Sequence, residues 1–155
     1  MGVIESIVAY ICLNYLYSSE LSKTRLTKLV YLADWFSSLA DGRQITNIKW
    51  VFNHYGPYVD DVMNIIENNR NFEVEYSLNT YGTERTTISY HGLEEDIILT
   101  DRQREILDVV MKKTSNMYFN DFINYVYSTY PIVSSDRYSY LDLVKLARDY
   151  RENNN

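Results

Sequence analysis

The sequence predicts a mainly α protein of the α+β class: a compact bundle of about six helices around a buried central helix, with a small β-hairpin or three-stranded sheet. Three observations support this prediction. Apolar residues recur at helical spacing through most of the chain, residues 24–40 are apolar on almost every side, and strict alternation is confined to residues 72–76 and 86–90. The chain also holds 5 Gly and 2 Pro among 155 residues, too few for a disordered or loop-rich all-β protein.

Length and composition indicate one cytoplasmic domain over residues 1–150, followed by a polar tail over residues 151–155. No apolar run approaches the roughly 18 residues of a membrane span, and no signal peptide is evident. The net charge of −6 disfavours nucleic acid, because contacts with phosphate need Lys and Arg. The single Cys12 excludes an internal disulfide, and with two histidines it gives no basis for a zinc site or another cofactor.

The first half of the chain begins with an amphipathic helix over residues 3–17. The central helix follows over residues 24–40, with Ser22 or Thr24 as its N-cap and Gly42 just after its end. Because a helix that is apolar on every side must be covered by other elements, we expect this helix to lie in the middle of the fold.

An extended segment near residues 48–53 and a Tyr55–Pro57 turn come next. Pro57 is placed to open a short helix, whose positive end Asp60 and Asp61 would complement. The alternating segments 72–76 and 86–90 then predict a hairpin, to which residues 48–53 could add a third strand.

The second half is predicted to be helical. Thr100 and Gln103 form a capping box for a helix near residues 101–113. A second helix spans residues 117–130 and is stopped by Pro131, and the last covers residues 139–150. The polar tail after it is expected to fray.

The sequence contains no recognisable catalytic motif. Asp60 and Asp61 are neighbours on a helix and point about 100° apart, so they cannot share a proton as paired catalytic carboxylates do. His54 has no Ser or Cys nucleophile in a motif with it. We therefore predict that the protein is not an enzyme, and keep as a rival hypothesis a hydrolase that uses His54, Asp34 or Asp60.

Asp34 interrupts the apolar central helix, where a lone buried carboxylate is costly unless it is paired. One interpretation is structural: an ion pair with Lys28 or Arg25, or a cap on the backbone of the Tyr55–Pro57 turn. The other is a polar recognition point for a partner within a hydrophobic groove.

A group of motifs lies between residues 26 and 57. It comprises Leu26-Thr27-Lys28-Leu29-Val30-Tyr31-Leu32-Ala33-Asp34, then Gly42, Ile45-Thr46, Trp50 and Tyr55-Gly56-Pro57. Together with the helix that starts at Leu99-Thr100 and the later Tyr130-Pro131, this set resembles the Panacea domain of the SocA-type antitoxin family of bacteria and their phages, over most of residues 5–131.

The resemblance implies a mostly helical, non-enzymatic domain that binds and neutralises a cognate toxin encoded nearby. It also implies a possible link to a protease or adaptor, since one studied type of member delivers its toxin to a protease. The motif positions, structural or partner-binding, are Lys28, Tyr31, Asp34, Trp50, Tyr55, Gly56 and Pro57.

Two other functions stay open at this point. One is a phage or mobile-element accessory protein with the same fold that acts as a scaffold or adaptor. The other is a DNA-binding regulator like a winged helix, although Glu73, Glu75 and Glu84 on the predicted hairpin disfavour contact with DNA.

Overall fold

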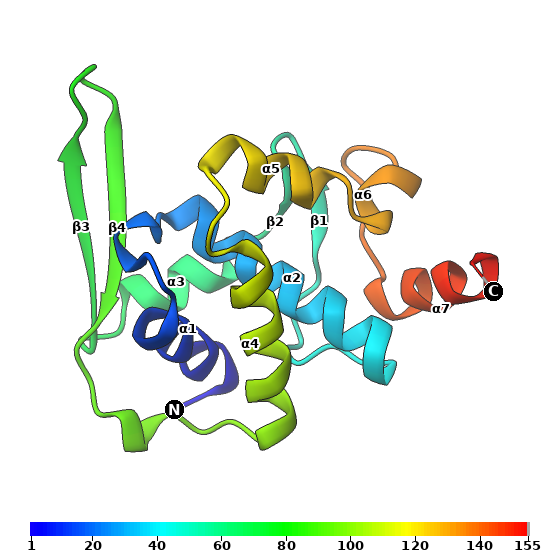
Figure 1. The fold of residues 1–155 in the computed structure, drawn as a ribbon, viewed down its shortest axis with the longest axis horizontal. Helices are drawn as coiled ribbons and strands as arrows, with labels where there is room; N and C mark the ends of the chain where they lie inside the picture. The colour runs from blue at the N-terminus through cyan, green and yellow to red at the C-terminus, as the bar shows by residue number, and fades with distance from the viewer. Residues whose placement is uncertain (155) are drawn as a thin grey trace.

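The computed structural model describes residues 1–154. This part of the chain contains seven α-helices that pack together, and two small antiparallel sheets of two strands each. Figure 1 shows their arrangement. The prediction of a mainly α protein with a little β structure is confirmed. The helices are α1 (Val3–Asn14), α2 (Lys23–Asp41), α3 (Asp61–Glu67), α4 (Asp101–Thr114), α5 (Phe119–Tyr127), α6 (Tyr130–Ser134) and α7 (Leu143–Asn153).

Helix α2 is the central helix that the sequence predicts. It crosses the middle of the molecule and touches α1, α3, α4, α5 and α7 (Figure 1). The Ser22 side chain accepts a hydrogen bond from the Arg25 amide at 3.1 Å, so Ser22 is the N-cap. Gly42 ends the helix in the left-handed conformation, with φ of 73°. Leu26, Leu29, Val30 and Leu32 are all 0% exposed, which places the core around this helix.

The sheets differ from the prediction. Strand β1 (Val51–Asn53) pairs with β2 (Gly56–Tyr58), and β3 (Phe72–Leu78) pairs with β4 (Glu84–Tyr90). The hairpin therefore forms as expected, but residues 48–53 do not extend it, because the chain reverses at once and gives β1 a local partner. The free edge of β1 is covered instead by residues 138–141, where the Phe52 amide donates to Ser139 O and the Leu141 amide to Trp50 O, at 2.9 and 2.8 Å.

Both prolines occupy other places than predicted. Pro57 lies in β2, and α3 begins only at Asp61. Pro131 lies in the first turn of α6, where a helix has no use for the missing N–H, while the preceding helix α5 has already ended at Tyr127.

The C-terminal segment is also more ordered than predicted. Helix α7 starts at Leu143 and continues to Asn153, so the first three residues of the expected frayed tail are helical, and Asn155 lies outside the described residues. Arg151 donates to the carbonyl oxygens of Ser38 and Leu39, both at 2.9 Å. The Ser38 carbonyl also accepts from the Gly42 amide at 3.1 Å, so Arg151 adds a second donor there. These bonds to the last turn of α2 join α7 to it.

Membrane insertion of a helix finds no support within residues 1–154. None of the helices there has both the length and the apolar character needed to cross a bilayer.

Candidate partner-binding site

Three motif residues of α2 have buried polar side chains, and each of them makes hydrogen bonds to a different segment of the chain. Lys28 is 1% exposed, and Tyr31 and Asp34 are 0% exposed. Their spacing of three residues puts them on successive turns of one helix. Lys28 reaches β2, Tyr31 reaches the start of α6, and Asp34 reaches residues 44–50. The helix therefore fixes the position of three separate segments.

The Asp34 carboxylate is an acceptor for five donors. Its Oδ1 atom accepts from the amides of Ile45 and Thr46, both at 2.9 Å. Its Oδ2 atom accepts from Trp50 Nε1 at 2.9 Å, from the Thr46 hydroxyl and from Gln44 Nε2 at 3.3 Å. The structural interpretation of a backbone cap is thus the observed one, although the capped loop is residues 44–50 and not Tyr55–Pro57.

The sequence-based ion pair does not form. Lys28 donates to Pro57 O, whereas Arg25 donates to Tyr15 Oη and Met117 O. Burial raises the pKa of the Asp34 carboxyl, and the hydrogen bonds from Thr46, Trp50 and Ile45 oppose this rise. A carboxylate saturated in this way is closed to solvent and to any partner.

Within residues 1–154, Lys28 is a buried cation without a carboxylate partner, as Arg25 is. Its Nζ atom lies 3.4 Å from Pro57 O, and burial lowers its pKa to about 8. The Lys28 side chain therefore provides a hydrogen bond between α2 and the Tyr55–Pro57 segment.

Tyr31 and Trp50 complete the buried set. Their rings meet edge to face with centroids 5.6 Å apart, at an angle of 79°. The Tyr31 hydroxyl lies 2.8 Å from Thr129 Oγ1. Because Thr129 Oγ1 donates to Val126 O, Tyr31 is the donor of this bond, and it ties the Thr129 cap of α6 to the central helix.

Gly56 and Tyr55 of the Tyr55-Gly56-Pro57 segment lie in different environments. Gly56 has φ of 95°, and a Cβ atom there would lie 3.4 Å from the Tyr127 ring, so this position favours glycine. Tyr55 is 74% exposed, whereas the other six motif positions are buried. Within the motif, Tyr55 is the side chain that a partner can reach.

The residues of the rival hydrolase hypothesis do not form a common site. Asp34 is sealed in the core, whereas Asp60 is an exposed residue at the start of α3. His54 is exposed, and its Nδ1 atom lies 3.3 Å from Tyr138 Oη. Nor does the described part of the chain bring three or more His, Cys, Asp or Glu side chains together as a metal site.

A groove that was not predicted from the sequence lies between α2 and α4. Its volume is about 710 Å³, and it is lined by Phe36, Leu39, Ala40, Arg102, Glu105, Ile106, Asp108 and Val109. Val109 is 56% exposed although it is apolar. The sequence contained one indication of this groove, because Val109 is apolar but lies beside the core stripe of α4 and not within it.

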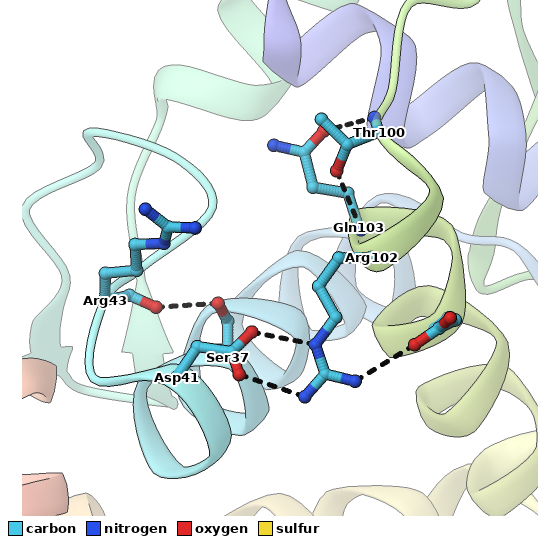
Figure 2. Close-up of polar contacts among 7 residues, drawn as sticks. Ser37, Asp41, Arg43, Thr100, Arg102 and Gln103 are labelled. Atoms are coloured by element: carbon cyan, nitrogen blue, oxygen red, sulfur yellow. Dashed lines mark hydrogen bonds and ion pairs between the residues drawn. The ribbon is translucent and has the colours of Figure 1, made fainter.

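An ion-pair network joins α2 and α4 beside this groove. Arg102 of α4 donates to both carboxylate oxygens of Asp41 of α2, at 2.9 and 3.0 Å, and to Glu105 at 3.0 Å (Figure 2). This contact lowers the pKa of Asp41. Figure 2 also shows the predicted capping box, in which the Gln103 amide donates to Thr100 Oγ1 and the Thr100 amide to Gln103 Oε1. The network fixes the end of α2 relative to the start of α4.

We expect the Asp34→Ala variant to lose about 3 kcal/mol of unfolding free energy, because it leaves buried N–H groups of Ile45, Thr46 and Trp50 without an acceptor. Urea denaturation followed by tryptophan fluorescence measures this loss. The exposed Asp136→Ala variant is the control and should stay within about 0.5 kcal/mol of wild type. Equal stabilities of the two variants would contradict the role of Asp34.

Lys28 predicts a specific pH dependence of stability. Its pKa is about 8 in the folded protein and near 10.5 unfolded, so between these values the unfolded chain binds more protons and stability rises with pH. From pH 7.5 to 9.5, wild type should gain about 1–2 kcal/mol relative to Lys28→Met. Comparing the two proteins removes the contributions of other titrating groups.

The neighbouring Thr27→Val variant is the control for this effect. Thr27 Oγ1 is buried without a hydrogen-bond partner, so its removal changes a buried polar group and no charge. This variant should keep the pH slope of wild type in the same urea titrations. A Lys28→Met protein with the wild-type slope would show that Lys28 is not the titrating group.

Comparison with known proteins identifies a family for the larger part of the chain. The family model described as antitoxin SocA-like, Panacea domain, matches residues 26–131, from α2 to α6, and includes all seven motif positions. No curated protein and no solved structure gives a match. Because the matched segment covers more than half of the sequence and carries the buried motif, the chain belongs to the antitoxin SocA-like Panacea domain family.

Proposed function

We propose that this protein is an antitoxin that binds a cognate toxin encoded nearby and neutralises it in the cytoplasm without catalysing a reaction. The observation that carries the proposal is the family match over residues 26–131, in which an antitoxin-like role is the family-level function. An antitoxin that neutralises its toxin by covering part of its surface needs an interface larger than about 1,000 Å².

The distribution of tyrosine supports a protein partner. The chain contains 16 tyrosines, and several of them expose their rings to solvent. Tyr55, Tyr76, Tyr81, Tyr118, Tyr138 and Tyr140 are all more than half exposed. Because tyrosine is enriched in protein interfaces and their energetic centres, these side chains suit contact with another protein.

The charge distribution supports the same class of partner. The net charge is −6, and the hairpin of β3 and β4 carries the exposed Glu73, Glu75 and Glu84. A winged-helix regulator would instead present Lys and Arg to phosphate. The proposed partner is therefore a protein and not DNA.

The buried motif has a supporting role in this proposal. Lys28, Asp34 and Trp50 are closed to solvent and fix loops, so they shape the surface without touching the toxin. Contacts are expected from exposed side chains around this scaffold.

Co-expression tests the proposal. The product of the adjacent reading frame, expressed alone from an inducible promoter, should stop growth, and growth should recover when the full-length chain is expressed with it. The two proteins should co-purify on a tag placed on either one. A neighbour that is neither toxic nor bound would refute the proposal, and binding without rescue would favour a scaffold or adaptor role instead.

A further inference from the structure

We infer that the groove between α2 and α4 is the docking site for one amphipathic helix of the partner, with an apolar stripe flanked by Lys or Arg. The inference rests on the proposed function only in taking the partner to be the toxin. It assigns the groove, and not the family-motif residues, as the centre of the interface.

The groove is lined by side chains from two helices, α2 and α4. Phe36, Leu39 and Ala40 of α2 follow i, i+3, i+4 spacing, and Ile106 and Val109 of α4 are three residues apart, so each helix presents one ridge. A third helix packs between two such ridges, as in other helix-in-groove complexes. The stretch from Arg102 to Val109 spans about 10 Å, or two turns of an occupying helix.

The exposure of these side chains marks the groove as unfilled. Val109 is 56% exposed, Ala40 is exposed, and Phe36 and Leu39 are half-buried. Burying such groups contributes roughly 25 cal/mol per Å² of apolar surface removed from water. An apolar stripe on the occupant would provide that cover.

The charged side chains of the groove, Arg102, Glu105 and Asp108, form its rim and favour an occupant of the opposite charge. Arg102 is shared by Asp41 and Glu105, and Asp108 accepts a hydrogen bond from the Tyr10 hydroxyl at 2.6 Å. The groove itself is lined by two carboxylates, Glu105 and Asp108, and one guanidinium, Arg102, so its lining is net negative. Arg43 lies near Asp41, Lys112 borders a neighbouring hollow with Asp108, and Lys113 stacks on Tyr125, so none of these three cations lines the groove. Lys or Arg beside the apolar stripe of the occupant would meet Glu105 and Asp108.

The same charges disfavour other occupants. A second copy of this chain would bring its own acidic rim against this one, and nucleic acid would bring phosphate. Like charges facing each other at an interface cost affinity and so exclude wrong partners.

The walls are already held in place before anything binds. The Arg102–Asp41 pair joins α4 to α2, and Arg151 caps the end of α2 from α7. Helices that are joined before binding lose less conformational entropy when a partner binds, which favours affinity.

A peptide experiment tests the groove without the toxin. The probe is a 14-residue helical peptide of Leu and Lys with one leucine stripe, added to the ¹⁵N-labelled full-length chain, and its control has Glu in place of Lys. The Leu–Lys peptide should shift the amide signals of Phe36, Leu39, Ala40, Ile106 and Val109 and bind at least tenfold more tightly than the control peptide. Shifts centred elsewhere, or no shifts, would overturn the assignment.

Matched variants of the full-length chain sharpen the test. Val109→Lys and Glu105→Lys should each raise the dissociation constant of the Leu–Lys peptide at least tenfold. Val133→Lys is the control for an exposed valine on another helix, 69% exposed on α6, and Glu75→Lys is the control for an exposed glutamate on β3. The controls should bind as wild type does, and equal losses in all four variants would refute a groove-specific site.

The same variants separate this inference from the proposed function. When the adjacent gene product binds wild type, Val109→Lys and Glu105→Lys should abolish both binding and growth rescue while far-ultraviolet circular dichroism stays unchanged. If these variants bind and rescue like wild type, the groove assignment is wrong and the antitoxin function stands. If the adjacent product does not bind wild type, the function fails and the peptide shifts alone decide the groove.

Discussion

The structure depends on the buried carboxylate of Asp34. A helix as apolar as α2 must be covered on every side, and the covering segments include residues 44–50, which form no helix or strand. The backbone N–H groups of such a segment need acceptors once they are buried. Asp34 supplies them for Ile45 and Thr46 and fixes the Trp50 ring as well. One side chain thereby lets an irregular segment pack against the core as a helix would.

Lys28 and Tyr31 extend the same principle along α2. Each residue of the series faces a segment distant in sequence, and each makes its own hydrogen bond there instead of pairing with its helical neighbours. Burial disfavours the charged form of Lys28 and lowers its pKa. A single hydrogen bond to Pro57 O compensates for part of the lost hydration. This arrangement gives Lys28, Tyr31 and Asp34, at three-residue spacing, each a structural role in this chain.

The sequence allowed prediction of the features that local patterns determine. The apolar length of residues 24–40, the Thr100–Gln103 capping box and the alternation at residues 72–76 each specify an element by themselves. The errors concern contacts between distant segments. Pro57 matches the start of a helix equally well, and it is the pairing of β2 with β1, the positive φ of Gly56 and the bond from Lys28 that place it in a strand. The pairing of β1 with residues 138–141 leaves no local signal either.

The groove was not predicted because it forms between α2 and α4, which are distant in the sequence. Ile106 belongs to the core stripe of α4 and Val109 lies beside it, and the sequence does not show that Val109 and α2 together line a groove. The seven motif positions are buried, apart from Tyr55. A surface built from Val109, Glu105 and Asp108 can therefore change without disturbing the hydrogen bonds of Lys28, Tyr31 and Asp34. One scaffold can in this way present different docking surfaces, so membership in the family does not by itself specify a toxin.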